Sequence, residues 1–370
     1  MASVDRKKNV KIVYHSFGGR YSDNPRALHQ RALSREDLDA EHVWLAAPRH
    51  AGSFPAGTAT VPWGTPEALA ELRSADLVVA DIHLPAWDKR PGTTYLQTWH
   101  GTPLKRIHRD ALSQFELEEV MARLDDDIAS WDVLLGPSEA GADALRAAFG
   151  FTGPVPVTGY PRNDALLAPD AAERRARVRA ELGIEDGRTA VLYAPTWRDD
   201  ERLEGAEGFR LGLDPERFAE RLGEEHVLLL RLHHLAPDAQ RGQDVPGVMD
   251  VSDHPDNNDL YLAADVLVTD YSSAMFDFAL TGKPVLVLAY DLEHYRDVLR
   301  GFYFDLDEIT PGPVLRTSEE AIDALADLDG VRAAYEDRYE RFRDRFCHAE
   351  DGRAADRVLD LVLPAQGTGA

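Results

Sequence analysis

The sequence has almost no cysteine, no long apolar run and no excess of positive charge. Its 370 residues include one cysteine, Cys347, which excludes an internal disulfide and a cysteine-based metal cluster. No apolar run approaches the roughly 20 residues that a membrane-spanning helix needs. The positive charges near the N-terminus are not followed by the apolar core of a secretory signal. We therefore expect a cytoplasmic protein.

The charge balance narrows the range of partners. With 65 acidic against 41 basic residues the formal net charge is −24, whereas a nucleic-acid-binding protein normally carries a basic surface. The same balance disfavours strong attraction to anionic lipid, although it is compatible with a local basic patch. Only six of the basic residues are lysines, and Lys105 and Lys283 fall inside motifs described below. Either a site uses these compact ammonium groups or their placement is due to chance.

Several common catalytic and cofactor motifs are also missing. The sequence contains neither G-x-x-x-x-G-K-[ST] nor G-x-G-x-x-G, so neither a P-loop ATPase nor a simple dinucleotide enzyme is supported. The G-x-S-x-G elbow of hydrolases is absent as well. The acidic runs at residues 125–127 and 199–200 would suit a metal ion, but in so acidic a chain we favour solvated charge. The sequence thus indicates no cofactor and leaves the use of a divalent metal open.

Short apolar, β-branched segments alternate with longer helical patterns along most of the chain. This alternation predicts an α/β protein with parallel sheets that helices cover on both faces. The strands are too many for one doubly wound sheet, so we expect two such sheets, with ligands at the carboxyl ends of their strands. The expected strands are 9–17, 42–47, 76–81, 94–100, 132–137, 154–159, 189–196, 226–233, 248–252, 266–270 and 284–290.

A turn-rich segment at residues 159–164, followed by a helical pattern at 171–182, marks the boundary between the two sheets. We expect an N-terminal Rossmann-like domain at residues 1–165 and a C-terminal one at 166–350. The helical pattern in the last segment, 351–370, is expected to pack back onto the body of the protein. Two such domains facing each other would share a cleft.

Two motifs follow the ends of expected strands and carry hydroxyl and basic groups. The first, HGTP at residues 100–103, places His100 at the carboxyl end of an apolar strand. In isolation it is equally compatible with a histidine that caps a turn. The second, APTWRD at residues 194–199, contains Thr196 and Arg198, and by itself it favours an ordinary loop.

Two further motifs suggest a site for an anionic ligand. In RLHH at residues 231–234 the two-residue period puts Arg231 and His233 on one face, an arrangement that suits an anion. The alternative is a plain strand end at the surface. Near residue 270 an apolar strand runs through DYSS into a helix, so that Ser272 and Ser273 lie at the helix N-terminus, where anions are favoured. In isolation one serine would more often be only an N-cap.

In this order and spacing, the motifs resemble the CDP-glycerol glycerophosphotransferase family, whose enzymes prime and polymerise teichoic acids. The resemblance extends from about residue 95 to 305 and again over EDGRAADRV at 350–357, whereas residues 1–90 carry little diagnostic sequence. The matching segments are HGTPLK (100–105), GYPRND (159–164), LYAPTWRD (192–199), RLH (231–233), DLYLAADVLVTDYSSAMFDFAL (259–280), KPVLVLAYDLEHY (283–295) and RGFYFD (300–305).

The resemblance implies a GT-B-like fold and a specific reaction. An acceptor hydroxyl would attack the β-phosphate of CDP-glycerol or a related CDP-alditol, and CMP would leave. The acceptor would be a polyol phosphate or a lipid-linked saccharide, and the enzyme would work in the cytoplasm, with peripheral contact to the inner face of the cell membrane left open. The implied catalytic residues are His100 and His233, although His234 competes for the second role. The residues expected to bind the donor are Ser272, Ser273, Arg231, Thr196, Arg198 and Asp270, with supporting charge from Lys105 and Arg162.

Three alternatives stay open on the sequence alone. A ribitol phosphate or other CDP-alditol phosphotransferase would share every motif. A glycosyltransferase of the GT-B fold that uses a UDP-sugar is a more distant reading. A nucleotide-binding protein without catalytic activity is disfavoured, because all the candidate groups are in place. The acceptor, the number of units added and the oligomeric state cannot be read from these residues.

Overall fold

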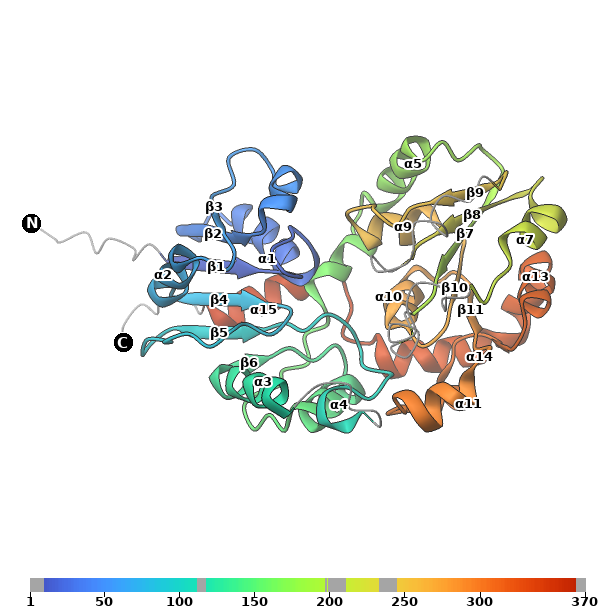
Figure 1. Ribbon diagram of the computed structural model, residues 1–370. Coiled ribbons are helices and arrows are strands. Elements are labelled where there is room, and N and C mark those ends of the chain that lie inside the picture. Colours follow the sequence, from blue (N-terminus) through green and yellow to red (C-terminus); the bar gives the residue numbers. More distant parts are fainter. Residues whose placement is uncertain (1–9, 112–117, 197, 199–210, 233–244, 364–370) are drawn as a thin grey trace, which may run out of the picture. The chain divides into compact units, whose positions relative to one another are not determined.

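The computed structural model describes residues 10–111, 118–196, 198, 211–232 and 245–363. The chain forms two compact units (Figure 1). Unit 1 comprises residues 1–100, 117–164 and 349–370, and unit 2 comprises residues 101–116 and 165–348. The chain therefore crosses from unit 1 to unit 2 between Asp164 and Ala165, next to the boundary expected from the sequence. The segment 101–116, which the sequence analysis assigned to the N-terminal domain, belongs to unit 2, and the C-terminal helix belongs to unit 1.

Unit 1 is built on a six-stranded parallel sheet with the order β3-β2-β1-β4-β5-β6. Its apolar strands lie where the sequence predicted them; β2 begins two residues earlier than expected, and β1, β4, β5 and β6 are shorter than expected. β3 is a short edge strand that was not expected. The strands are β1 (Val10–His15), β2 (Ala40–Ala46), β3 (Thr60–Pro62), β4 (Leu77–Ala80), β5 (Thr94–Gln97) and β6 (Val133–Leu134).

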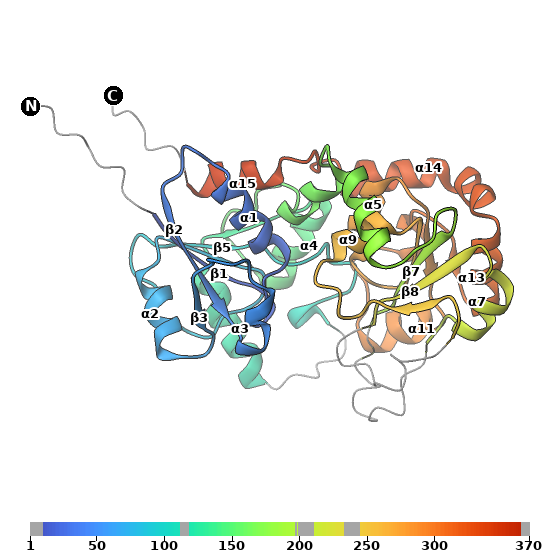
Figure 2. The same ribbon diagram turned by 90° about the horizontal axis from the view of Figure 1, so that it is seen from above.

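Helices cover the sheet of unit 1 and complete its core. Leu28 of α1 and Val358 of α15 pack against Ile12 and Tyr14 of β1, so the two ends of the chain share one apolar cluster. Helices α1 and α15 lie side by side in both views (Figures 1 and 2). The helices are α1 (Asp23–Leu33), α2 (Pro66–Ser74), α3 (Glu118–Ser130), α4 (Glu139–Phe149) and α15 (Ala354–Val362).

Local contacts explain why the last helix joins unit 1. The Asp164 carboxylate accepts hydrogen bonds from the backbone N–H groups of Ala354 and Ala355, each at 2.8 Å, and so caps the start of α15. Gly159 has a φ of 70°, and a Cβ there would lie 2.7 Å from Oε2 of Glu350. The GYPRND and EDGRAADRV motifs therefore bind to each other, and we assign them a structural role.

Unit 2 repeats the architecture with the order β12-β11-β10-β7-β8-β9, again with parallel strands. One face of this sheet, including Val191, Tyr193 and Val268, packs against Phe218 of α7 and Ile322 of α13. The strands are β7 (Thr189–Ala194), β8 (His226–Leu230), β9 (Val248–Asp250), β10 (Val266–Thr269), β11 (Val285–Leu288) and β12 (Val314–Leu315). The helices are α5 (Ala171–Glu181), α7 (Pro215–Leu222), α9 (Asn257–Ala263), α10 (Ala274–Phe278), α11 (Leu292–His294), α12 (Leu306–Ile309), α13 (Ser318–Ala326) and α14 (Leu328–Phe346).

Both sheets have the strand order of a Rossmann fold, which confirms the α/β class with two doubly wound sheets of a GT-B-like chain. The strand order reverses between β1 and β4 in unit 1 and between β7 and β10 in unit 2. Ligands in such sheets bind beyond the carboxyl ends of the strands at this switch point. Each unit therefore has one place where a site is expected.

One expected strand is wrong. Residues 154–159 form no strand, and only an isolated parallel bridge joins Val157 to Gly136. Pro154 and Pro156 supply no backbone N–H, so this segment cannot pair continuously with a neighbouring strand.

We also find that no helix within the described ranges has both the length and the apolar character required to cross a membrane.

Candidate functional site

His100 lies at the carboxyl end of β5, as the sequence predicted, and its ring is held in a fixed orientation. Nδ1 lies 2.6 Å from the backbone carbonyl oxygen of Asp81, which follows β4. A carbonyl can only accept, so Nδ1 must carry the proton and Nε2 carries the lone pair. The indole of Trp99 stacks on the imidazole with ring centroids 4.2 Å apart. The side chain is thus prepared to accept a proton at Nε2.

The surroundings of His100 favour its neutral form. Burial lowers the pKa of His100 below its ordinary value of 6.5. The Asp81 carbonyl and the Asp23 carboxylate act in the opposite direction, but their effect is smaller. Near neutral pH the imidazole is therefore uncharged, which is the form that a general base requires.

The residue that orients His100 is itself firmly anchored. The Asp81 side chain is fully buried, and it accepts hydrogen bonds from Ser16 Oγ at 2.5 Å and from the Phe17 N–H at 3.1 Å. Burial, and then the nearby Asp23 carboxylate, raise the pKa of Asp81 well above its ordinary range. Asp81 thereby joins the loop after β1 to the loop after β4, at the switch point of unit 1.

Arg162, predicted to supply supporting charge, forms an ion pair within unit 1. Its Nη1 lies 2.9 and 3.1 Å from the two carboxylate oxygens of Asp23. The neighbouring Asn24 accepts a hydrogen bond from the Arg162 N–H and donates one to the Trp99 carbonyl. This chain of contacts reaches the residue before His100, so Arg162 helps to position the imidazole. Its positive charge is offset by Asp23.

The expectation of solvated charge for the acidic run at residues 125–127 is wrong for Asp127, whereas Asp126 is exposed. Asp127 is buried, at 3% exposure, and does not carry solvated charge. Its carboxylate contacts His83 Nδ1 at 2.9 Å and accepts hydrogen bonds from the Tyr95 hydroxyl at 3.1 Å and the Trp131 indole N–H at 3.0 Å. A buried carboxylate is stable with such donors, and so it has a structural role behind β5. Residues 199–200 lie outside the described part of the chain.

In unit 2, Thr196 and Asp270 meet at the switch point between β7 and β10. The backbone N–H of Thr196 lies 2.9 and 3.0 Å from the two carboxylate oxygens of Asp270. Thr196 Oγ1 is buried and has no hydrogen-bond partner among the described residues, which is costly unless a ligand supplies one. These two predicted residues are therefore brought together where a donor is expected to bind.

Arg198 does not expose its charge. The side chain is 2% exposed, and its guanidinium donates to Asp291 at 2.7 and 2.9 Å and to Asp270 at 2.8 Å. A further hydrogen bond goes to the Thr196 carbonyl. With these contacts the guanidinium holds the loops after β7, β10 and β11 together. We infer a positioning role for Arg198, in place of the direct phosphate contact expected from the sequence.

The two serines precede helix α10 as predicted and are partly exposed. Ser272 Oγ accepts a hydrogen bond from the backbone N–H of Ala274 at 3.2 Å. The Ser273 side chain makes no capping hydrogen bond to α10. Ser272 therefore acts as a cap, and the Ser273 hydroxyl is the better candidate for contact with a ligand.

Arg231 has an internal role that the sequence did not reveal. Its Nη1 donates to the backbone carbonyls of Val251, Ser252 and His254 at 2.7, 2.6 and 2.8 Å. This binds the end of β8 to the chain that follows β9. His233, predicted on the same strand face as Arg231, and His234, which competes for its role, lie outside the described residues, so their roles stay predictions.

Lys105 and the RGFYFD motif are connected within unit 2. Lys105 pairs with Phe302 in an isolated antiparallel bridge, and Tyr303 N–H donates to the Leu104 carbonyl at 2.9 Å. The Tyr303 hydroxyl donates to the Asp110 carboxylate at 2.8 Å. Two of the motifs thus attach the segment after His100 to unit 2. The polypeptide passes from one unit to the other between His100 and Gly101.

Lys283, the other lysine within a motif, caps a helix. Its Nζ donates to the carbonyls of Tyr261, Leu262 and Ala264 at the end of α9, at 3.2, 2.8 and 2.6 Å. Burial, with a further contribution from Arg175, lowers the pKa of Lys283 to about 7. The ammonium group is therefore directed into the protein.

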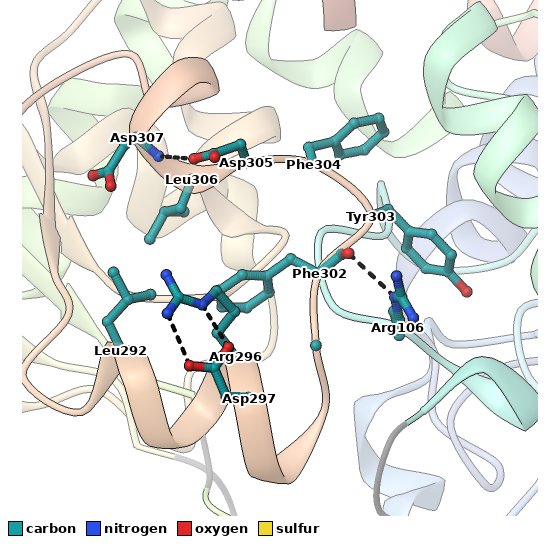
Figure 3. A pocket seen from close by; sticks show the side chains of 11 residues that line it. Arg106, Leu292, Arg296, Asp297, Phe302, Tyr303, Phe304, Asp305, Leu306 and Asp307 are labelled. Atoms are coloured by element: carbon teal, nitrogen blue, oxygen red, sulfur yellow. Dashed lines mark hydrogen bonds and ion pairs between the residues drawn. The ribbon is translucent and has the colours of Figure 1, made fainter.

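A pocket of about 400 Å³ lies beside the RGFYFD motif, and its lining contains none of the predicted site residues (Figure 3). Its two arginines are engaged with protein groups. Arg296 forms a two-pronged pair with Asp297 at 2.7 and 2.8 Å, and Arg106 donates to the Phe302 carbonyl at 3.3 Å. The full lining is Arg106, Leu292, Arg296, Asp297, Gly301, Phe302, Tyr303, Phe304, Asp305, Leu306 and Asp307.

Sequence reasoning missed several residues near His100. Ser16, Phe17, Asp23 and Asp81 all lie in the first 90 residues, where no motif was recognised. The only available signals were their positions after apolar strands, which parallel strand order makes meaningful. Within the described part of the chain no group of three or more histidine, cysteine, aspartate and glutamate side chains is arranged to hold a metal ion.

Comparison with known proteins yields a family and several relatives. The family model for CDP-Glycerol:Poly(glycerophosphate) glycerophosphotransferase matches residues 1–364. The chain is 36% identical to the teichoic acid glycerol-phosphate transferase of Staphylococcus aureus, over 96% of this chain and 93% of that protein. It is 34% identical to the teichoic acid poly(glycerol phosphate) polymerase of Bacillus subtilis, over 99% of this chain and 50% of the polymerase. This chain thus spans half the length of that relative.

Solved structures and more distant relatives agree with this picture. The structure of the wall teichoic acid polymerase TagF matches with a TM-score of 0.86 and 31% identity, over 95% of this chain and 88% of that one. A variant of that polymerase has been studied with CDPG. The teichoic acid poly(ribitol-phosphate) polymerase of Bacillus spizizenii is 30% identical, but only over 56% of this chain and 33% of that protein. The similarity is therefore broader to the glycerol phosphate enzymes.

Proposed function

This chain belongs to the CDP-glycerol:poly(glycerophosphate) glycerophosphotransferase family, and we propose that its own residues transfer glycerol phosphate from CDP-glycerol with release of CMP in the way described below. The family and the transferase class predicted from the motifs are confirmed by the match over residues 1–364. The observation that carries the proposal is the contact of His100 Nδ1 with the Asp81 carbonyl, which leaves the lone pair on Nε2. His100 is accordingly the general base.

The proposed reaction is a single displacement at phosphorus. The acceptor hydroxyl oxygen forms a bond to the β-phosphorus of CDP-glycerol, and the bond from that phosphorus to the bridging oxygen breaks. The electron pair of the broken bond leaves with CMP, and the hydroxyl proton passes to Nε2 of His100. Such transfers depend mainly on positioning and charge stabilisation, and no covalent enzyme intermediate is required.

The donor is assigned to residues of unit 2. Ser273 is partly exposed and makes no capping hydrogen bond, and the buried Thr196 Oγ1 needs a partner. We assign contacts with the donor to these two hydroxyls and to the backbone near Ser272. Asp270 and Arg198 hold the loops that present them. His233, outside the described residues, stays the predicted partner of the departing CMP.

Replacing Ser273 with alanine should weaken the binding of CDP-glycerol. A single neutral hydrogen bond contributes about 0.5–1.5 kcal/mol, and one to a charged group about 1.5–3 kcal/mol. The dissociation constant measured by titration calorimetry should therefore rise by roughly tenfold. Ser272→Ala serves as the comparison. Because the Ser272 hydroxyl caps the N–H of Ala274, this variant should have a lower thermal stability. An unchanged dissociation constant for Ser273→Ala would argue against this donor contact.

The acceptor is proposed to be a polyol phosphate chain or a lipid-linked saccharide. The test is CMP release with CDP-glycerol and CDP-ribitol as donors, each combined with a glycerol phosphate oligomer or a lipid-linked disaccharide. We expect CMP release from CDP-glycerol to depend on the acceptor and to exceed release from CDP-ribitol. Faster reaction with CDP-ribitol would instead identify the chain as a ribitol phosphate transferase.

Contact with a membrane surface is likewise a proposal, and it would be measured as sedimentation with anionic vesicles.

A further inference from the structure

Backbone strain is concentrated around His100. Among described residues other than glycine, four have a positive φ: Phe17 at 38°, Asp23 at 56°, Trp99 at 52° and His108 at 55°. The first three lie around His100, since Trp99 precedes it, the Phe17 and His100 ring centroids are 5.1 Å apart, and Asn24, which follows Asp23, donates to the Trp99 carbonyl. Positive φ is strained for a bulky side chain, and such strain gathers at functional sites.

The protein holds Phe17 in this conformation through its backbone. The Phe17 N–H donates to the buried Asp81 carboxylate at 3.1 Å, and the N–H groups of Gly19 and Arg20 donate to the Ser16 carbonyl at 2.9 and 2.8 Å. Gly19 approaches β2 so closely that a Cβ would lie 2.1 Å from the Ala47 nitrogen. The loop after β1 is therefore built tightly, whatever side chain stands at position 17.

Packing of the core does not explain the aromatic ring at this position. Phe17 is 38% exposed, whereas Tyr14 and Trp44 of the adjoining strands are buried. Among the described residues, Phe17 is the one aromatic side chain in the set of exposed large apolar groups, which otherwise comprises Leu33, Val298 and Leu361. An exposed ring recovers only part of the free energy that burial would give. The strain and the exposure therefore call for another role.

The position of Phe17 indicates that role. Phe17 follows β1, Asp81 follows β4 and His100 follows β5, so all three lie at the carboxyl ends of neighbouring strands beside the switch point of unit 1. With ring centroids 5.1 Å apart, no third ring fits between Phe17 and His100. The exposed phenyl ring is therefore within reach of a substrate whose hydroxyl approaches the imidazole.

We propose that Phe17 positions the acceptor, with its exposed ring packed against the C–H groups of the polyol whose hydroxyl His100 deprotonates. This rests on the proposed role of His100 as the base. A polyol chain presents carbon-bound hydrogens as well as hydroxyls, and sites for such ligands combine an apolar wall with a few polar groups. Phe17 exchanges no proton and forms no bond, so it is a positioning residue.

The test compares Phe17→Leu with Phe17→Tyr in acceptor saturation curves, with a glycerol phosphate oligomer as the acceptor and CDP-glycerol as the donor. Leucine keeps apolar volume but removes the ring, and tyrosine keeps the ring. We expect kcat/KM for the acceptor to fall by about tenfold or more in Phe17→Leu, since misplacement by about 1 Å can cost 100-fold. Phe17→Tyr should stay within about threefold of the wild-type value. Leu33→Ala, which removes an exposed apolar group elsewhere in unit 1, should leave the curves unchanged.

Two further measurements separate acceptor positioning from other roles. The dissociation constant of CDP-glycerol and the melting temperature should be the same in Phe17→Leu and the wild type. Weaker CDP-glycerol binding in Phe17→Leu would show that the ring stacks on the donor, and a lower melting temperature without rescue by tyrosine would show a structural role. Either result, or an unchanged acceptor curve, overturns the proposal. Full turnover in His100→Ala would instead contradict the role of His100 as the base. This outcome is distinguishable from a failure of the Phe17 proposal, because it is measured in a different variant.

Discussion

Replacing His100 with alanine should reduce turnover by about 100-fold or more, the scale on which a general base contributes. The imidazole is neutral near pH 7 because burial lowers its pKa, and its Nε2 is the atom able to accept the acceptor proton. Binding of CDP-glycerol should be largely retained, because the proposed donor contacts lie in unit 2. Single-turnover CMP release and titration calorimetry measure the two effects separately.

A second substitution at the same position makes the test sharper. In His100→Asn the side-chain amide can still donate to the Asp81 carbonyl, as Nδ1 does, but it cannot accept a proton at neutral pH. We therefore expect the asparagine variant to be as impaired as the alanine variant. His294→Ala, which removes an exposed histidine in unit 2, serves as the control with near-normal turnover. If His100→Asn reacts at a wild-type rate, His100 is not the base.

The second large effect is expected from Arg198→Ala, which should lower the free energy of unfolding by about 3–5 kcal/mol, the usual result of breaking a buried ion pair. The guanidinium is 2% exposed, lies between the Asp270 and Asp291 carboxylates, and is 5.0 Å from the ring centroids of Tyr271 and Tyr295. Its removal leaves two carboxylates without their main counter-ion. The measurement is urea unfolding followed by circular dichroism, with the midpoint and the slope fitted independently.

A surface ion pair provides the matched control for Arg198. Arg217 forms pairs with Glu319 and Glu220, all on the outside of unit 2. Such pairs are screened by solvent and contribute little, so Arg217→Ala should unfold close to the wild-type midpoint. A wild-type midpoint for Arg198→Ala as well would mean that the network does not hold the loops together. Arg198→Ala should also weaken CDP-glycerol binding, because Thr196 depends on the same network.

The sheets were predictable because parallel, buried strands have a strong signature. Runs such as 285–288 are apolar throughout, and their alternation with helices limits the topology to a few choices. The edge strand β3 was missed because it has three residues and ends in a proline. The segment 154–159 was overpredicted because its apolar residues outweighed its two prolines, whose missing N–H groups prevent pairing.

The site was predictable only in part. Position at a strand end indicated His100 in unit 1 and Thr196 and Asp270 in unit 2, and strand order brings such ends together within each sheet. The sequence could not show that Arg198 is buried, because its partner Asp291 is 93 residues away. It also could not show the strained conformation of Phe17, since a φ of 38° has no signature in an aromatic residue. Hydrogen-bond partners and backbone angles are properties of the fold, and these determine which charged groups are available to a substrate.

The pH dependence of kcat/KM for the acceptor tests the role of His100 most directly. A base with a lowered pKa is active at neutral pH and loses activity when it becomes protonated, so the acid limb should have its midpoint below 6.5 and a slope of one. The residual activity of His100→Asn should lack this limb, because the titrating group is gone. A wild-type midpoint at or above 6.5, or the same limb persisting in His100→Asn, would contradict the assignment of His100 as the general base.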